Sequence, residues 1–227
     1  MNTLEECRHG IWGSEDARAA LAQAKSARLL LVADTHERLP VLRGILRDYG
    51  PRCDALIFAG DGLADFVEYR EEAIADGQAC AFLPPVIFLV AGNGDLPAYR
   101  VTSEKDPSEC VFFRIPPIQT ADICRQKVLI THGHLHSINF STEPVVNAAR
   151  HNGCSVVVYG HTHIPAENRY QSIFAVNPGS ICLPRGDSRP SFAILTLYAP
   201  ESKTPPHCEF KQPGAGVPAL KRHTRRR

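Results

Sequence analysis

Short apolar runs alternate with amphipathic segments through the first two thirds of the chain. The runs are three to five residues long and rich in Val, Ile and Leu, which is typical of strands buried on both faces. They predict strands at residues 29–32, 55–59, 86–90, 128–130 and 155–159.

Segments between these runs have the spacing of helices. In residues 39–49, Leu42, Ile45 and Leu46 share one helical face, and Pro40 falls in the first turn, where proline is tolerated. Strands that alternate with helices indicate an α/β fold, in which helices cover the faces of a sheet. Two further helices are predicted at residues 64–75 and 142–151.

The last third of the chain has strand-like runs without helices between them, which favours antiparallel pairing. Residues 101–110 are polar and predict no clear element. An additional strand pair is predicted at 112–115 and 118–123. The strands predicted in the last third lie at 166–170, 173–176 and 191–197.

These patterns divide the chain into three parts. Residues 1–27 form an N-terminal extension, in which Ser14 can cap a helix that continues through 17–25. Residues 28–199 form the domain that carries the alternating pattern. Residues 200–227 form a Pro- and Gly-rich tail with a basic end, which we expect to be flexible.

Composition narrows the class of protein. The 227 residues carry a net charge of +1, so the chain as a whole has no charge attraction for nucleic acid or an anionic membrane. No run approaches the ~20 apolar residues of a membrane span, and the chain opens with no signal-peptide pattern. The eight scattered cysteines are expected to be reduced thiols, which favours a cytoplasmic protein.

Metal-binding side chains closely follow each of the five apolar runs. Ligands of an open α/β sheet bind in the crevice beyond the carboxyl ends of its strands, so we expect these side chains to meet. A mixed set of nitrogen and oxygen ligands suits a cluster of divalent metal ions. The five motifs are Asp34-Thr35-His36, Gly60-Asp61, Gly92-Asn93, His132-Gly133-His134 and Gly160-His161-Thr162-His163.

Each motif taken alone has an ordinary structural interpretation. Asp34 can cap a helix, and Asp65 suits the first turn of one. Asp61 and Asn93 lie in Gly-rich turns. A single His in such a place is commonly a hydrogen-bonded structural residue. The recurrence of ligand types after five strands favours a shared metal site, because chance would scatter them over helices and both strand ends.

In this order the motifs resemble those of the calcineurin-like metallophosphoesterases. The details are most similar to the small bacterial and archaeal phosphodiesterase branch, the YfcE-like group, and the small subunit of the retromer complex shares that fold. The resemblance covers residues 28–197 and excludes the extension and the tail. Two further runs are similar to that branch, namely Asn177-Pro178-Gly179-Ser180 and Leu183-Pro184-Arg185.

The resemblance implies an α/β sandwich of two sheets with helices on the outer faces, and a dinuclear metal site. It implies hydrolysis of a phosphoester by a water shared between two divalent ions. Mn²⁺ is the first expectation for these ligands, with Fe, Zn, Co and Ni as alternatives. The implied ligands are Asp34, His36 and His163 for one ion, Asn93, His132 and His161 for the other, and Asp61 as the bridge that is also essential to catalysis.

One departure from the family bears on mechanism. Many members have His after the Asn of the Gly-Asn motif, where it assists the leaving group, but this chain has Gly94 there. The phosphodiesterase branch also commonly lacks this His, so Gly94 favours diesters over monoesters. Asp95 and His134 are the candidates for the leaving-group acid, and neither is distinguished by the sequence.

Two other functions remain open at this stage. The resemblance to the retromer subunit implies a protein-interaction scaffold with little or no activity as the alternative to a phosphodiesterase. The basic end of the tail suggests binding to nucleic acid as a further function, although the near-neutral net charge favours a solvated tail. We expect a small phosphoester as substrate and no membrane partner. The sequence identifies neither the substrate nor the oligomeric state.

Overall fold

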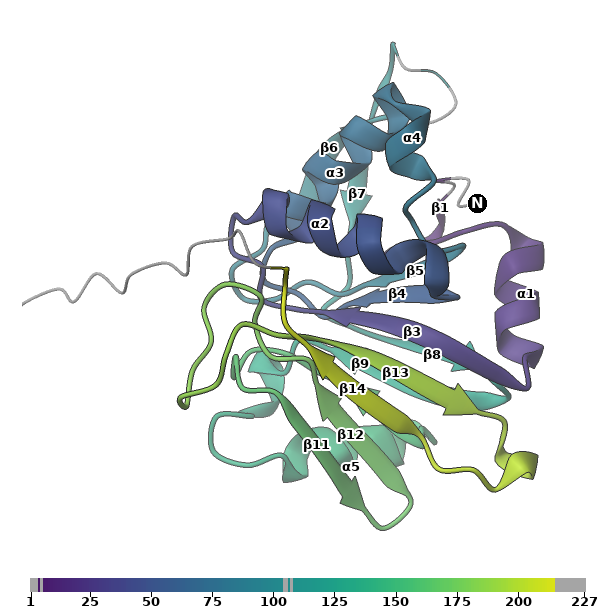
Figure 1. The fold of residues 1–227 in the computed structure, drawn as a ribbon, viewed down its shortest axis with the longest axis vertical. Helices are drawn as coiled ribbons and strands as arrows, with labels where there is room; N and C mark the ends of the chain where they lie inside the picture. Colours follow the sequence, from purple (N-terminus) through teal and green to yellow (C-terminus); the bar gives the residue numbers. More distant parts are fainter. Residues whose placement is uncertain (1–3, 5, 104–105, 107, 215–227) are drawn as a thin grey trace, which may run out of the picture.

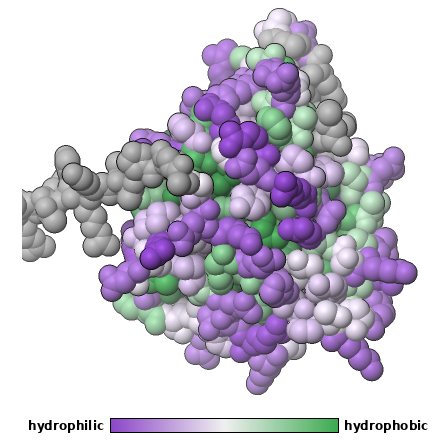
Figure 2. Space-filling view, in the orientation of Figure 1, coloured by the Kyte–Doolittle hydropathy of each residue, from purple (hydrophilic) through white to green (hydrophobic). Residues whose placement is uncertain are grey.

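Two β-sheets stack face to face with helices outside them (Figure 1). The computed structural model describes residues 4, 6–103, 106 and 108–214. Hydrophilic side chains cover most of the face shown in Figure 2, and apolar ones are visible between them in small patches. None of the helices in this described part of the chain is long and apolar enough to cross a bilayer.

The first sheet has three parallel strands at its centre. β3, β4 and β5 run parallel, and the strands on either side of them run antiparallel to their neighbours. Within the described residues, the order of its seven strands is β1 (Glu6–Arg8), β2 (Ile11–Trp12), β5 (Val86–Leu89), β4 (Ala55–Phe58), β3 (Ser26–Val32), β13 (Phe192–Tyr198) and β14 (His207–Lys211).

The second sheet also has a parallel centre. β9, β10 and β12 are parallel, and β8 and β11 close its edges in antiparallel pairing. The order of its five strands, among the residues described, is β11 (Ala166–Tyr170), β12 (Ile173–Asn177), β10 (Val156–Val158), β9 (Gln126–Thr131) and β8 (Ile118–Ile123).

The alternation of side chains along each strand divides the core into layers. Leu29 and Leu31 of β3 pack between the two sheets with Val128 and Ile130 of β9. Leu30, on the opposite face of β3, packs against the helices. Successive side chains of a strand point to opposite faces, so a continuous apolar run fills both layers at once.

Helices cover the outer faces as the periodicity predicts (Figure 1). The predicted helix at 39–49 is observed with those bounds, and a strand occurs at each of the five apolar runs. The helices of the first sheet's outer face are α2 (Leu39–Tyr49) and α3 (Leu63–Ala75), and that of the second is α5 (Glu143–His151). Short turns are α4 (Gly77–Cys80), η1 (Gly50–Arg52), η2 (His134–His136) and η3 (Pro200–Ser202).

One predicted strand pair is wrong. β7 (Cys110–Arg114) does not pair with β8, but forms a separate hairpin with β6 (Ala98–Thr102). β6 was not predicted, because it runs into the polar residues 101–110. β8 instead joins β9 in the second sheet. Pro116 and Pro117 separate the two strands, and because proline has no N–H to donate, the chain passes there from the hairpin to the sheet.

The N-terminal segment belongs to the first sheet. α1 (Glu15–Gln23) begins after Ser14, whose hydroxyl accepts the Ala17 N–H at 3.2 Å, as the capping argument expects. The strand β2 before it pairs with β5 and buries Trp12 completely. At the other end β14 pairs with β13, so regular structure continues beyond residue 199. The basic end at 221–227 lies outside the described residues.

Candidate metal centre

The five motif-bearing loops meet at one end of the sandwich. Three of them leave the parallel strands β3, β4 and β5 of the first sheet, and two leave the parallel strands β9 and β10 of the second. Backbone hydrogen bonds join neighbouring loops, from Asp34 N–H to the Gly60 carbonyl at 2.9 Å and from Gly160 N–H to the His132 carbonyl at 3.0 Å. The sheets therefore bring the predicted ligands together.

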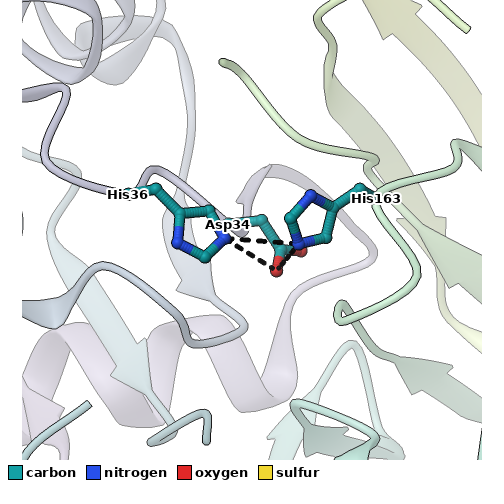
Figure 3. A group of neighbouring side chains, drawn as sticks. All are labelled: Asp34, His36 and His163. Atoms are coloured by element: carbon teal, nitrogen blue, oxygen red, sulfur yellow. Dashed lines mark hydrogen bonds and ion pairs between the residues drawn. The ribbon is translucent and has the colours of Figure 1, made fainter. Parts of the chain in front are cut away.

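Asp34, His36 and His163 form the first part of the cluster (Figure 3). His163 Nε2 lies 3.1 Å from Asp34 Oδ1 and 3.2 Å from His36 Nε2. His36 Nε2 lies 3.8 Å from the same carboxylate oxygen. Three ligand atoms therefore face one point, which is the arrangement that one small cation needs.

The second part contains Asp34, Asp61 and His132. His132 Nε2 lies 3.4 Å from Asp61 Oδ2 and 3.9 Å from Asp34 Oδ1. His161 joins it, because its Nδ1 lies 3.2 Å from His132 Nε2. Asp61 Oδ2 also lies 4.0 Å from His36 Nε2. Asp61 thus lies between the two parts, and Asp34 is close to both.

Asn93 is the one predicted ligand whose side chain is exposed. Its glycine neighbours contact Asp61 instead. Gly94 N–H donates to Asp61 Oδ1 at 2.6 Å, and a Cβ at Gly92 would come within 2.1 Å of that oxygen. Only glycine fits at position 92, so the Gly92-Asn93-Gly94 turn is shaped around the carboxylate.

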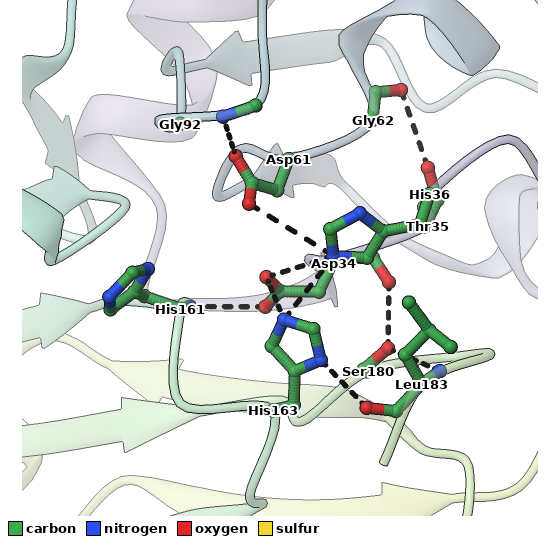
Figure 4. Close-up of polar contacts among 12 residues, drawn as sticks. Asp34, Thr35, His36, Asp61, Gly62, Gly92, His161, His163, Ser180 and Leu183 are labelled. Atoms are coloured by element: carbon green, nitrogen blue, oxygen red, sulfur yellow. Dashed lines mark hydrogen bonds and ion pairs between the residues drawn. The ribbon is translucent and has the colours of Figure 1, made fainter. Parts of the chain in front are cut away.

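Backbone carbonyls fix the orientation of two histidines. His132 Nδ1 lies 2.7 Å from the Ala59 carbonyl. Figure 4 shows the corresponding contact of His163, whose Nδ1 lies 2.7 Å from the Leu183 carbonyl. A carbonyl accepts only from an N–H, so in each neutral ring the proton is on Nδ1. The lone pair on Nε2 then faces the cluster, as in histidines that bind metal.

One buried atom is unsatisfied without a cation. Asp34 Oδ1 is buried and accepts no hydrogen bond from any described residue, although its partner oxygen Oδ2 accepts the His161 N–H at 3.1 Å. Burying an unpaired carboxylate oxygen is costly. Oδ1 is also the atom that both parts of the cluster share, so the residues present fit divalent cations.

Strained backbone supports the same interpretation. Asp34, His36 and Asp61 have φ of 54°, 44° and 54°, and His161 and His163 have φ of 69° and 60°. Residues other than glycine rarely adopt this left-handed conformation. Such residues persist where surrounding contacts hold them, and they concentrate at functional sites.

The electrostatics of the cluster favour binding of cations. Burial disfavours the charged form of Asp61, but the His132 imidazole and the Gly94 N–H outweigh it and hold the pKa of Asp61 well below its usual value. Burial and neighbouring histidines lower the pKa of His36 and of His161. A carboxylate and neutral imidazoles are the forms that bind metal, so little proton release is needed from Asp61, His36 and His161. At His132, burial opposes protonation, but Asp61 and Asp34 outweigh it and raise its pKa, so a metal ion competes there with a proton.

Asp95 holds the loop that carries Asp61. Its Oδ2 accepts the N–H groups of Asp61 and Gly92, both at 2.8 Å. Its Oδ1 accepts those of Gly62 at 2.9 Å and Leu63 at 2.8 Å. Both oxygens therefore serve as acceptors for backbone donors. These contacts favour an anchoring role over the proton-donor role that the sequence left open.

His134 lies at the edge of the cluster. Its ring centroid is 5.5 Å from that of His132 and 6.3 Å from that of His161. Its Nδ1 is buried and has no hydrogen-bond partner among the described residues. Burial and the nearby His132 lower the pKa of His134. Of the two candidate acids, it is the one with an uncommitted ring nitrogen near the centre.

Several supporting residues were missed or given other roles at the level of sequence. Ser180 donates its hydroxyl to the Asp34 carbonyl at 2.7 Å, and Asn177 Nδ2 donates to the Gly160 carbonyl at 2.8 Å. The signal for both was the Asn177–Ser180 motif, whose role had no explanation before. Asp65 is in the first turn of α3 as expected, and it also accepts the Thr35 hydroxyl and the Arg38 N–H.

Comparison with known proteins identifies the family of the chain. Residues 28–199 match the family model of the calcineurin-like phosphoesterase superfamily domain. The chain is 30% identical over 169 residues to phosphodiesterase YfcE of Escherichia coli, which covers 74% of this chain and 86% of that protein. The matched range contains every predicted metal ligand.

Solved structures show the same fold. A Streptococcus pneumoniae protein described as a predicted phosphoesterase superposes with a TM-score of 0.61 at 22% identity, covering 86% of this chain and 96% of that one. Vacuolar protein sorting 29 from Cryptosporidium parvum gives a TM-score of 0.58 at 18% identity, with 83% and 100% covered. The family match and the similarity to the Escherichia coli enzyme together decide the family: the chain belongs to the calcineurin-like phosphoesterase superfamily.

Proposed function

We propose that this protein is a metal-dependent phosphodiesterase with a dinuclear centre. The observation that carries the proposal is the convergence of five ligand-type side chains, from the ends of four strands in two sheets, around the unsatisfied Asp34 Oδ1, with His161 beside them against His132. When bound, two divalent cations supply an activated water as nucleophile and neutralise the charge that develops on the phosphoryl oxygens.

The arrangement of donors supports a division of the ligands between two cations. Mn²⁺ is the first candidate for this mixed set of donors, and Fe, Zn, Co and Ni are the alternatives. Asp61 lies between rings of both parts, which supports its role as the bridge. Asn93 is assigned from its place in the motif. The proposed ligands are Asp34, His36 and His163 for one cation, Asn93, His132 and His161 for the other, and Asp61 for both.

The residues around the centre support a diester as substrate. Gly94 has no side chain to donate a proton, and Asp95 is occupied by four backbone N–H groups. His134 is the proposed donor where the leaving group needs a proton, because its ring lies at the edge of the centre, 5.5 Å from the ring of His132. With few donors available, the site suits substrates whose leaving group departs readily and whose phosphate carries one negative charge.

The first prediction concerns Asp61. Asp61→Asn removes the negative charge from the proposed bridge while keeping its shape, so we expect metal-dependent hydrolysis of bis-p-nitrophenyl phosphate to fall to background. The measurement is the hydrolysis rate with added Mn²⁺, together with circular dichroism to show that the fold is retained.

A matched control lies at the other end of the same strand. Asp54 precedes β4 and its carboxylate accepts the Arg28 N–H at 2.7 Å, at the end of the sheet away from the centre. Asp54→Asn makes the same chemical change and should keep activity. Full activity in Asp61→Asn would contradict the bridging role.

The alternative function is a protein-interaction scaffold on the same fold. It is favoured by the structural likeness to vacuolar protein sorting 29 and by two exposed apolar side chains, Leu135 within η2 at 57% and Phe140 shortly after η2 at 93% exposure. Large apolar side chains exposed together are typical of interaction surfaces. Hydrolysis of bis-p-nitrophenyl phosphate separates the two functions: failure with each of Mn²⁺, Fe²⁺, Zn²⁺, Co²⁺ and Ni²⁺ would favour the scaffold.

A further inference from the structure

A cleft of about 350 Å³ lies beside the proposed metal centre. Its volume is within the range of small-molecule sites, about 300–1,000 Å³. His36 and Asp61 form part of its wall. The cleft therefore lies next to a phosphodiester that is held at the centre.

Gly94 keeps the cleft open towards the centre. It lies on the wall of the cleft, and a Cβ at this position would be 3.2 Å from Asp61 Oδ1 and 3.4 Å from Oδ2. A larger side chain at position 94 would therefore stand between the carboxylate and the cleft. Gly94, which departs from the common family motif, is thus also the residue that leaves the cleft open to the metal centre.

Apolar groups form another part of the wall. Leu96 is a large apolar side chain with 61% exposure, and Tyr99 is 9% exposed. The Tyr99 hydroxyl accepts the Leu96 N–H at 3.1 Å, which holds the ring against the loop. Ala64 adds a third small apolar surface. An ester group that covers Leu96 gains free energy from the apolar area removed from water.

The charged side chains of the cleft wall outside the metal centre are all acidic. Apart from the centre itself, its ionisable groups are Glu37, Asp95 and the Tyr99 phenol, and no Lys or Arg occurs among its described lining residues. Asp95 is satisfied by backbone N–H groups. Glu37 is exposed and forms no ion pair within the described part of the chain. Outside the metal centre, an anionic ester group would meet these carboxylates with no Lys or Arg of the described lining beside it.

We propose that this cleft receives an uncharged or cationic ester group of the phosphodiester, and that Glu37 disfavours an anionic one. The proposal rests on the phosphodiesterase function and specifies its substrate class. Glu37 acts here on specificity, through its charge, and has no part in the chemical step.

The test uses three substrates with short second ester groups of different charge. Each is a p-nitrophenyl phosphodiester, and the second ester group is propyl, 2-aminoethyl or 2-carboxyethyl. We expect kcat/KM for the carboxyethyl ester to be lower than for the propyl ester by roughly two- to fivefold at low salt, the range expected for one exposed charge. The aminoethyl ester should be the best substrate, and the differences should shrink as salt screens them.

Charge variants assign the effect to one residue. Glu37→Gln should make the kcat/KM values of the three substrates more nearly equal, and Glu37→Lys should reverse the order of these values. Glu109→Lys is the matched control, because Glu109 is exposed next to the far end of the β6–β7 hairpin and is not part of the cleft wall. It should leave the order of the wild type unchanged.

The outcomes separate this proposal from the proposed function. Equal kcat/KM for the three substrates in the wild type, or an unchanged order in Glu37→Lys, would overturn the cleft proposal while leaving the phosphodiesterase intact. Hydrolysis of none of the three by the wild type with any of the five metals would overturn the proposed function, and the cleft proposal with it.

Discussion

A single carboxylate, that of Asp95, positions Asp61 from outside the cluster. Its four acceptor contacts tie the strained turn at Asp61 to the start of α3 and to the loop after β5. Residues that orient metal ligands typically change metal affinity or activity by 10–100-fold when they are replaced. Replacing Asp95 should therefore lower metal affinity or activity about as much as replacing a metal ligand.

Asp95→Asn distinguishes the anchor from a proton donor. The amide can accept at one atom only, so about half of the contacts are lost and metal affinity should fall roughly 10–100-fold. Titration calorimetry with Mn²⁺ measures this directly. An anchor also predicts equal losses of activity for esters with good and poor leaving groups. If metal affinity is unchanged and activity is lost only for esters with poor leaving groups, Asp95 is the leaving-group acid and not an anchor.

The residue scale also shows what a sequence can reveal about such a site. His132 and His163 are predictable because metal-binding side chains recur after strands. Their partners, the carbonyls of Ala59 and Leu183, are backbone atoms and leave no trace in the choice of side chain. Asp95 is visible as a residue, but in a Gly-Asn-Gly-Asp turn nothing distinguishes an anchor from an acid.

At the scale of elements, β2 is short and structurally important. Trp12 is completely buried, stacks on Phe66 with ring centroids 5.1 Å apart, and packs at a tilt against Phe113 with ring centroids 4.8 Å apart. The N-terminal strand thereby joins the first sheet to α3 and to the β6–β7 hairpin. Periodicity could not predict it, because two residues are too few to show an alternation.

Trp12→Ala should destabilise the protein without changing the chemistry of the site. Loss of a buried aromatic side chain costs about 3–5 kcal/mol of the free energy of unfolding, measurable by urea denaturation. Trp12→Phe keeps a ring in the stack and should cost much less. It leaves no hydrogen-bond partner unsatisfied, since the indole N–H has none among the described residues. Equal stability of the alanine variant and the wild type would contradict this account.

Elements with long regular patterns were predicted well. α2 has several turns of regular spacing, with Pro40 in its first turn and Gly50 directly after its last residue. The pairing of β6 with β7 was not predictable, because the partner of a strand depends on distant contacts and not on its own pattern. Local pattern therefore gives the elements, and tertiary packing decides which of them meet.

At the scale of the whole molecule, the proposed centre joins the two sheets. Asp34, His36 and Asp61 follow strands of the first sheet, and the remaining histidines of the cluster follow strands of the second. A cation bound by both sets binds the folded protein and not the unfolded chain. Mn²⁺ at 100 times its dissociation constant should therefore add about 2.7 kcal/mol to the stability.

Thermal unfolding with and without Mn²⁺ measures this contribution. The melting temperature of the wild type should rise with the concentration of Mn²⁺ and return to its starting value with EDTA. Asp61→Asn should show a much smaller rise. A melting temperature that is independent of metal in the wild type would argue against a shared centre, whatever the activity.

The contacts of Asp34 also have a consequence for the order of events in folding. Its partners His161 and Ser180 lie 127 and 146 positions away along the chain. Contacts of such separation form late, after the strands that carry them have paired. We therefore expect Mn²⁺ to slow unfolding and to leave the refolding rate unchanged in stopped-flow experiments. Faster refolding with metal would mean that a partial centre already exists in the folding nucleus.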